Sequence, residues 1–392
     1  MAFCTSKRNR VAHLMANNWA FIIWIAMTAS LCNMCAGKRK ELVMGTYEYR
    51  TTWFWAIVIF IPVILGAALR TTAEGDTGTY KLMFDKCPKD LTQLTDYVFG
   101  AERDIGYAFW EIFFKNCISD NFQLFIAVNA VFCSILLVSV YRRLSCSYAI
   151  TIFLFVAGFE YFQWMFNGMR QFMAVCIALS CTEDIINRQY KRIIIPFVIA
   201  ALLHMSVLIV LPCLFFVQGK AFNKRIILFI VGIIFAGVVL GRTGQLNDII
   251  AEMMQSTQYD SVLDEFYMTM DSGTNALRVL VYLVPTIIAL IGLRFIRQSN
   301  DPVINFCTNM SVISSGIYIV SMFTSAVMIG RLPIYFSIYN YILMPWEIEH
   351  IFEKRSARLV TVGLVICYLA YNYYQMVGVY GQSFNLGFLS LG

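Results

Sequence analysis

The chain has 392 residues, of which 59% are hydrophobic and only 14% are charged, and its formal net charge is +6. A soluble globular domain usually carries about 25% charged residues, so this composition excludes one soluble domain. It predicts an all-α polytopic integral membrane protein, built as a single multi-pass domain over residues 1–392. The basic residues stand in short clusters beside apolar segments, which favours a role in membrane topology over binding of nucleic acid.

We expect ten apolar segments to span the membrane, because each approaches the ~20 residues needed to cross ~30 Å of hydrocarbon. In chain order they are residues 19–36, 52–69, 121–141, 147–166, 168–186, 225–241, 276–296, 305–329, 332–348 and 358–377. A further apolar stretch, 193–217, is either one long span or two short helices that meet near His204. The total is therefore about ten to twelve transmembrane helices.

Two connections between these segments are long and acidic. Residues 71–120 contain nine acidic and five basic residues, and residues 242–275 contain six acidic residues and one basic residue. The shorter connections are basic, so the positive-inside rule places them in the cytoplasm and leaves both long loops outside.

Basic clusters flank the stretch 193–217 on both sides, at residues 188–192 and 220–225. One span between them would put these clusters on opposite sides of the membrane. A hairpin that turns near His204 returns both to the cytoplasm. Because two arms of ~12 residues reach only ~18 Å each, this hairpin would be re-entrant.

With this topology, the polar residues at the ends of spans gather on the outer face. They are Arg70, Asp76 and Tyr80 around the second span, Asn167, Arg170 and Gln171 between the fourth and fifth, His204 at the hairpin tip, and Arg331 in "GRLPIY". Each has a simpler explanation when taken alone, such as an arginine that snorkels to the headgroups or a structural histidine. Three arginines at one mouth, however, repel each other unless an anion joins them. A guanidinium suits a phosphate, so we expect a lipid-borne pyrophosphate.

The stretch "NGMRQ" at residues 167–171 is read as the start of a helix that faces this anion. Asn167 is the expected N-cap, since its side-chain oxygen can accept from exposed backbone amides. Arg170 and Gln171 would point toward the pyrophosphate, where the helix N-terminus adds partial positive charge. Gly168 would let a headgroup approach closely.

Four ordered stretches carry a family resemblance: "LRTTAEGDTGTYKLMF", "ERDIGYAFW", "FNGMRQFMAVCIALS" and "ALLHMSVLIVLP". Together they resemble the EpsG family of exopolysaccharide-synthesis proteins, which belongs with the Wzy-type polymerases of lipid-linked glycans such as O-antigen. The matching residues are Arg70, Asp76, Tyr80, Phe84, Gly106, Tyr107, Asn167, Arg170, Gln171, His204 and Ser206, with a looser match at Arg331 and Tyr335.

The resemblance implies a fold related to the C-type glycosyltransferases (GT-C). It implies action on undecaprenyl-pyrophosphate-linked oligosaccharide at the outer face of a bacterial cytoplasmic membrane, as both donor and acceptor. His204 is then the base for the acceptor hydroxyl, and Arg170 meets the leaving pyrophosphate together with Arg70 and Arg331. Asp76 would orient His204 or bind sugar. The remaining predicted contacts with substrate are Tyr80, Asn167, Gln171 and Tyr335.

No metal motif accompanies these residues, so we expect a metal-independent mechanism without a cofactor. A separate protein that regulates chain length is an expected partner, besides the lipid bilayer. Three alternatives stay open: a glycan ligase of the same broad fold, a non-enzymatic flippase of lipid-linked oligosaccharide, and a membrane O-acyltransferase that would rely on His204.

Overall fold

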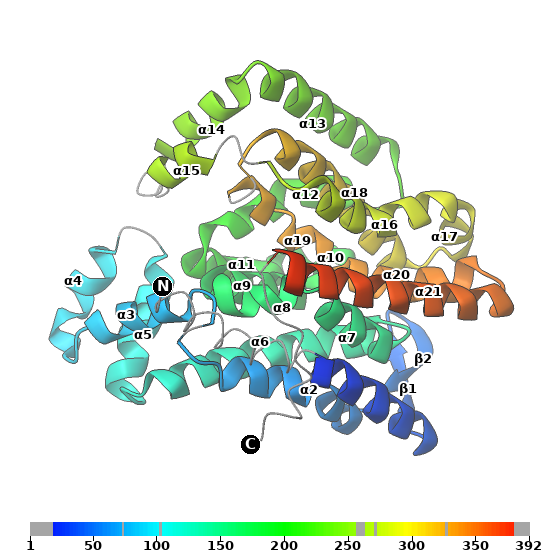
Figure 1. Ribbon diagram of the computed structural model, residues 1–392, viewed down its shortest axis with the longest axis horizontal. Helices are drawn as coiled ribbons and strands as arrows, with labels where there is room; N and C mark the ends of the chain where they lie inside the picture. Colours follow the sequence, from blue (N-terminus) through cyan, green and yellow to red (C-terminus); the bar gives the residue numbers. More distant parts are fainter. Residues whose placement is uncertain are drawn as a thin grey trace.

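The computed structural model is almost entirely helical and describes residues 19–72, 74–101, 104–255, 263–269, 273–325 and 328–379. The described chain begins with the apolar helix Trp19–Met34. The strands β1 (Lys38–Val43) and β2 (Thr46–Thr51) then pair as an antiparallel hairpin. The helices that follow (Figure 1) are α2 (Trp53–Ala68), α3 (Thr77–Lys86), α4 (Leu94–Phe99), α5 (Ile105–Cys117), α6 (Phe122–Leu144), α7 (Tyr148–Ala157), α8 (Glu160–Asn167), α9 (Met169–Ser180), α10 (Thr182–Ile186), α11 (Tyr190–Leu203), α12 (Val210–Val217), α13 (Lys224–Arg242), α14 (Gln245–Gln255), α15 (Leu263–Thr269), α16 (Ala276–Ile291), α17 (Leu293–Ser299), α18 (Pro302–Val320), α19 (Ile334–Ser337), α20 (Asn340–Ile351) and α21 (Lys354–Tyr373). Short 3-10 turns are η1 (Leu91–Gln93), η2 (Met205–Ile209), η4 (Ser321–Phe323) and η5 (Ile329–Arg331), and a π-helical turn, η6 (Tyr374–Val379), follows α21.

Three of the described helices are long and apolar enough to cross a membrane: α6, α13, and α18 with its extension to Phe323. A fourth candidate is the pair α16 and α17, which is bent by 67°. Several expected spans are instead divided into two shorter helices. The segment 147–166 becomes α7 and α8, because Phe159 between them has a left-handed backbone (φ 65°) that an α-helix does not contain. The segment 332–348 becomes α19 and α20.

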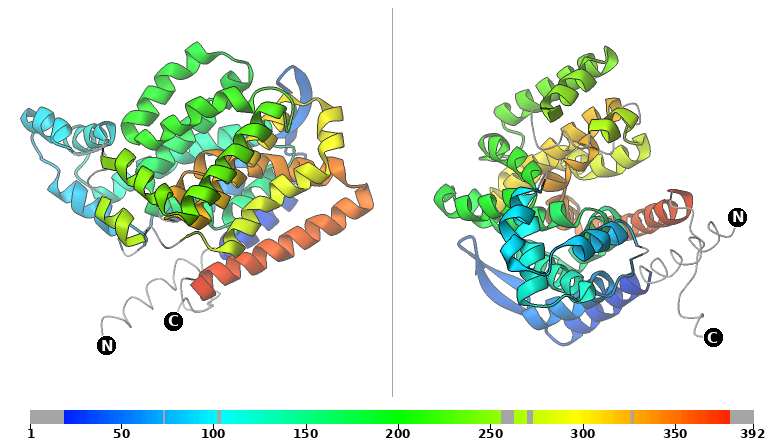
Figure 2. Two further views of the ribbon diagram at one scale, coloured as in Figure 1. Left: turned by 90° about the horizontal axis from the view of Figure 1, so that it is seen from above. Right: turned by 90° about the vertical axis from the view of Figure 1, so that its left-hand side faces the viewer.

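The helices run between two ends of the molecule, which we call the hairpin end and the site end. The hairpin end carries β1 and β2, and the site end carries α3, α4 and α5 on the opposite side of Figure 1. Helix α6 joins the two, and its 23 residues give it a length of ~34 Å. The right-hand view of Figure 2 looks at the site end, with α3–α5 toward the viewer.

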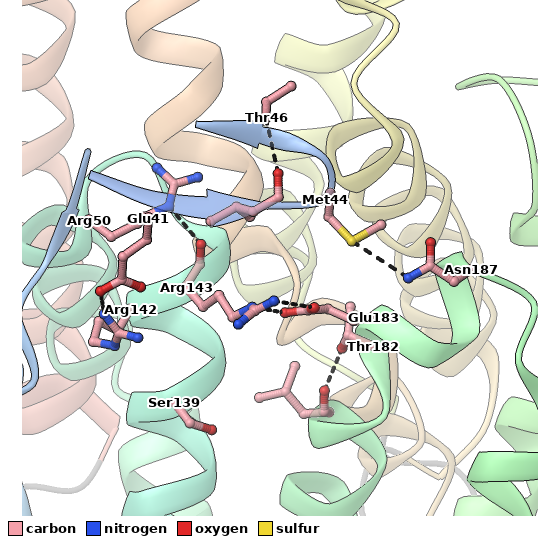
Figure 3. A network of polar contacts seen from close by, with 12 residues as sticks. Glu41, Met44, Thr46, Arg50, Ser139, Arg142, Arg143, Thr182, Glu183 and Asn187 are labelled. Carbon is pink, nitrogen blue, oxygen red and sulfur yellow. Dashed lines mark hydrogen bonds and ion pairs between the residues drawn. The ribbon is translucent and has the colours of Figure 1, made fainter. Parts of the chain in front are cut away.

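At the hairpin end, charged side chains fasten the strands to the helices (Figure 3). Arg142 Nη1 donates to Glu41 Oε1 at 2.6 Å, and Arg143 Nη2 donates to Glu183 Oε2 at 2.9 Å. Arg50 Nε donates to the carbonyl oxygen of Arg143 at 2.6 Å. Residues 38–40 and these two arginines belong to the short basic connections that the sequence predicted between spans. The structure shows a paired strand and arginines that are bound to carboxylates, so they also have a structural role.

The stretch 193–217 reverses direction at His204, as one of the two sequence-based alternatives predicted. Helix α11 ends there, because His204 is extended (φ −163°, ψ 110°), and η2 and α12 continue the chain. Gln218 Nε2 donates to the carbonyl oxygen of Ile185 at 2.9 Å, so the end of the returning arm lies beside α10, which directly precedes α11. The basic clusters 188–192 and 220–225 therefore lie at the same end. The depth of this hairpin in a bilayer stays a prediction.

Both long connections contain helices. Residues 71–120 fold into α3, α4 and α5, and within 242–275 the structure describes α14 and α15. These five helices all lie at the site end (Figure 1). Their placement outside the membrane stays a prediction, as does the treatment of residues 1–392 as one domain.

Candidate active site

A cavity of about 480 Å³ opens at the site end between α3, α9, the break at His204 and α14. Seven of the nine predicted site residues line it: Asp76, Tyr80, Asn167, Arg170, Gln171, His204 and Arg331. They come from four separate parts of the chain. We call this space the charged cavity.

Asp104 connects an arginine and a histidine of this cavity. Its Oδ2 lies 2.8 Å from Nη1 of Arg170, and its Oδ1 lies 3.2 Å from Nδ1 of His204. The Asp104 side chain is 1% exposed, whereas those of Arg170 and His204 are 17% and 18% exposed. A buried carboxylate therefore presents an arginine and a histidine to the same space.

The backbone around Asp104 explains how the carboxylate reaches both partners. Asp104 has a left-handed backbone (φ 58°, ψ 49°) at the N-cap of α5, a conformation that Asp adopts more readily than most residues. Two positions later, Gly106 packs on α11. A Cβ atom at Gly106 would lie 2.6 Å from Cβ and 2.9 Å from the carbonyl oxygen of Leu202. The missing side chain thus lets α5 approach the end of α11, where His204 follows.

Aromatic rings flank the guanidinium of Arg170. The ring centres of Tyr107 and Tyr80 lie 5.7 Å and 6.0 Å from its Cζ, within the range of a cation–π contact. Tyr107 is 1% exposed and packs edge-on against Tyr80. Asp104 and the two tyrosines thus hold the arginine from behind while its outer surface faces the cavity.

Arg331 is the second arginine that lines the charged cavity. Its guanidinium lies over the ring of Trp164 at 5.6 Å, and no carboxylate of the described residues is within ion-pair distance of it. Gln171, which is 5% exposed, donates through Nε2 to the carbonyl oxygen of Arg331 at 3.4 Å. The same Gln171 amide lies 3.5 Å from Oγ of Ser206. Gln171 thereby links α9 to the turn that carries Arg331.

Two predicted substrate contacts lie behind the cavity wall. Arg70 is 3% exposed and does not line the charged cavity; its guanidinium donates to Thr77 Oγ1 at 3.1 Å and to the carbonyl oxygen of Met165 at 2.9 Å. Tyr335 is 3% exposed, and its hydroxyl is 2.8 Å from Oγ of Ser206. Both hold neighbouring segments in place, and their contact with a substrate stays a prediction.

The predicted helix cap at Asn167 is wrong. Asn167 is the last residue of α8, Gly168 is the N-cap of α9, and that cap makes no side-chain hydrogen bond. The space that Gly168 leaves is not open to a headgroup either, since a Cβ there would lie 2.5 Å from the ring of Trp164. Asn167 still lines the charged cavity, and its Oδ1 is buried without a hydrogen-bond partner among the described residues.

The predicted pairing of Asp76 with His204 is replaced by the pairing with Asp104. Asp76 is exposed at the N-cap of α3 and lines the cavity, so contact with a sugar remains open to it. The quoted stretch "ERDIGYAFW" contains acidic residues before Gly106 and Tyr107, but the sequence did not predict Asp104 as a site residue. The sequence signal that could have identified Asp104 is its position two residues before Gly106, because this glycine marks the close contact with α11.

The comparisons with known proteins give one family. The model of the EpsG family matches residues 53–389, a range that contains every element of the charged cavity. A search of curated proteins and a search of solved structures each returned no match to this chain.

Proposed function

Since the chain belongs to the EpsG family, which is implicated in exopolysaccharide biosynthesis, we propose that it polymerises lipid-linked oligosaccharide repeat units. The growing glycan would pass from undecaprenyl pyrophosphate to a sugar hydroxyl of the next lipid-linked unit. The reaction would take place at the outer face of a bacterial cytoplasmic membrane. The observation that carries this proposal is Asp104, which bridges a histidine and an arginine in one cavity.

The transfer needs a base for the acceptor hydroxyl, and His204 suits this role. A carboxylate at Nδ1 favours the tautomer with a proton on that nitrogen, so Nε2 takes the proton from the hydroxyl. The hydroxyl oxygen then forms a bond to the anomeric carbon of the donor sugar. Asp104 stabilises the imidazolium that results, since its carboxylate lies at hydrogen-bond distance from Nδ1.

The same transfer needs positive charge where the leaving group departs. The bond between the anomeric carbon and the phosphate oxygen breaks, and its electron pair leaves with undecaprenyl pyrophosphate. Arg170 and Arg331 both line the charged cavity and would bind this anion as charge develops on it. Arg170 is already oriented by Asp104, so it needs little rearrangement during the reaction.

An apolar groove beside the site offers a path for the lipid. It has a volume of about 470 Å³ and lies between α11 and the returning arm, lined by residues such as Ile193, Phe197, Met205 and Leu211. Met205 directly follows His204 in the chain. A polyprenyl chain in this groove would carry its pyrophosphate to the charged cavity, with its tail still in hydrocarbon.

A glycan ligase of the same broad fold would use the same charges, and the structure favours neither acceptor over the other. A flippase would need charged residues along a path through the molecule. The residues described above gather at one end instead, which favours an enzyme. A chain-length regulator remains a proposed partner.

The test is the length of lipid-linked glycan made by purified protein in liposomes. Units extracted from cells that lack this protein would serve as donor and acceptor. We expect multimers from the wild type and single units from His204→Ala. If the His204→Ala variant also makes multimers, His204 is not the base. Single units with the wild type, together with glycan moved to another lipid or a protein, would identify a ligase.

A further inference from the structure

A second cavity of about 410 Å³ adjoins the charged cavity, and Arg331 is the one residue of its lining that the transfer described above uses. One wall is a single face of α8, formed by Glu160, Gln163, Trp164 and Asn167, which are spaced three and four residues apart. The facing wall is the start of α16 with Arg278, and the end of α21 closes the space. We call it the α8 cavity.

Glu160 is a buried carboxylate in this wall. It is 5% exposed and directly follows Phe159, whose left-handed backbone begins α8. Its Oε1 accepts from the hydroxyl of Tyr318 at 2.6 Å and lies 3.2 Å from Nη2 of Arg278. Its Oε2 is buried and has no hydrogen-bond partner among the described residues. A carboxylate oxygen that is buried and unpaired is costly unless a ligand supplies the missing donor.

The rest of the lining combines aromatic rings with side-chain amides. Five aromatic residues line the cavity: Phe159, Trp164, Tyr282, Tyr371 and Tyr374. Four amides accompany them: Gln163, Asn167, Asn275 and Gln375. Amides and carboxylates exchange hydrogen bonds with hydroxyls, and aromatic faces pack on the C–H faces of sugar rings. This lining suits a molecule with many hydroxyls and apolar ring faces.

The α8 cavity and the charged cavity share two lining residues, Asn167 and Arg331. Asn167 ends α8 and its Oδ1 is also an unpaired buried acceptor, which adds a second unused hydrogen-bonding atom at the junction. A ligand in the α8 cavity could therefore extend past Asn167 toward Arg170 and His204. The two cavities adjoin each other and their linings differ in chemistry. They therefore suit two different parts of one substrate.

We infer that the α8 cavity binds the oligosaccharide part of a lipid-linked unit, with Glu160 as an acceptor for sugar hydroxyls. The inference rests on the proposed function for the role of this site in polymerisation, but binding of the sugar can be measured by itself. Either the donor or the acceptor unit could supply this sugar, since their glycans have the same chemistry.

The experiment uses two soluble or dispersible probes with the full-length protein in detergent. One is the glycan released by mild acid from the lipid-linked unit, and the other is undecaprenyl pyrophosphate without sugar. Glu160→Gln is the main variant, because glutamine keeps an acceptor for Tyr318 and Arg278 but replaces the unpaired oxygen with a donor. Gln163→Ala is the second variant, since it leaves the contacts of Glu160 with Arg278 and Tyr318 intact. Glu353→Gln, an exposed residue outside both cavities, is the matched control.

We expect the Kd for the glycan to rise about tenfold in Glu160→Gln and to rise in Gln163→Ala, while Glu353→Gln binds like the wild type. Undecaprenyl pyrophosphate should instead bind to Glu160→Gln as it does to the wild type, and bind weakly to Arg170→Ala. Unchanged glycan binding in both α8-cavity variants would overturn the inference, as would a wild type that binds no glycan. Glycan binding without any binding of undecaprenyl pyrophosphate would leave the inference standing and count against the proposed function.

Kinetics then distinguish the two sources of sugar. With labelled donor fixed and unlabelled acceptor varied, a higher KM in Glu160→Gln at unchanged kcat assigns the cavity to the acceptor unit. A higher KM for the donor, with the acceptor fixed, assigns it to the growing chain. No change in either KM would contradict a place for this cavity in the reaction.

Discussion

Asp104 is the residue on which the two halves of the proposed chemistry depend. Its carboxylate contacts the base His204 and the cation Arg170, so one side chain sets the orientation of both. The sequence predicted that Asp76 either orients His204 or binds sugar. Asp76, however, is exposed in the turn before α3, where water competes for its carboxylate.

Asp104→Asn should leave the protein folded and lower its rate of polymerisation by roughly 10² to 10⁴, the range that a general base contributes. An amide can still bind His204, but it carries no charge to stabilise an imidazolium or to orient Arg170. The measurement is the initial rate of glycan extension in liposomes. Asp76→Asn is the matched control, with a change of a few-fold at most. A slow Asp76→Asn beside an active Asp104→Asn would restore the original prediction.

Glu111 gives a prediction about stability and pH. It lies on α5, outside the predicted spans, and its side chain is fully buried with one oxygen bound by the hydroxyl of Tyr97 at 2.8 Å. Burial raises the pKa of Glu111 from 4.5 to about 7, although the bond from Tyr97 lowers it somewhat. The folded state therefore favours the protonated carboxyl, and its stabilising contribution is present below pH ~4.5 and lost as the pH rises through about 7. The loss corresponds to about 3 kcal/mol.

Glu111→Gln should remove this part of the pH dependence, because glutamine is neutral at every pH. We expect the wild type to lose thermal stability between pH 5 and pH 8 more steeply than the variant does. Thermal unfolding in detergent at fixed ionic strength measures the difference. Parallel curves for the two proteins would show that Glu111 titrates normally in the folded state.

At the scale of elements, the packing of α5 against α11 places Asp104 beside His204. Gly106 makes this packing possible, since a Cβ there would lie 2.9 Å from the backbone carbonyl of Leu202. Backbone atoms cannot move aside as the end of a side chain can. A methyl group would therefore push α5 away from α11 and lengthen the contact between Asp104 and His204.

Gly106→Ala should reduce both activity and stability. The control is Gly232→Ala in α13, where a Cβ meets no atom within 4 Å and alanine favours the helix. We expect Gly232→Ala to be at least as stable as the wild type and fully active. Rates of glycan extension and unfolding temperatures for the two variants provide the test. Equal behaviour of both variants would mean that the close contact is not needed.

The break at His204 shows how much the sequence could predict at this scale. The polar histidine in an apolar run and the basic clusters on both sides indicated a turn, and the structure has one. The break at Phe159 gave no such signal, because an aromatic residue rarely adopts the left-handed backbone that Phe159 has. The partnership of Asp104 with His204 was equally hidden, since one hundred residues separate them in the chain. Charge and hydropathy predicted which end of each helix the site would occupy, but not which side chains would meet.

At the scale of the whole molecule, the positions of the helix ends make the membrane topology testable. The helix ends at Arg70, Arg170 and His204 gather at the site end, and the basic residues 220–225 lie with Ile185 and Glu183 toward the hairpin end. Helix α14 lines the charged cavity through Ile250 and Met254, so residues 245–255 belong to the site end. A membrane between the two ends would then hold α6, α13 and α18 across it.

The last prediction is that Lys220 and Asp248 lie on opposite sides of the membrane, Lys220 inside and Asp248 outside. Both are exposed, and α13 runs between them with 19 residues, enough to cross ~28 Å. Lys220→Cys and Asp248→Cys are introduced in a background without other cysteines, and an impermeant maleimide is added to intact cells. Asp248→Cys should react at once and Lys220→Cys only after the membrane is opened. Asp248 is used because position 260, farther along the same predicted outer loop, lies outside the described residues. If both positions react in intact cells, α13 does not cross the membrane, and the placement of the charged cavity at the outer face fails with it.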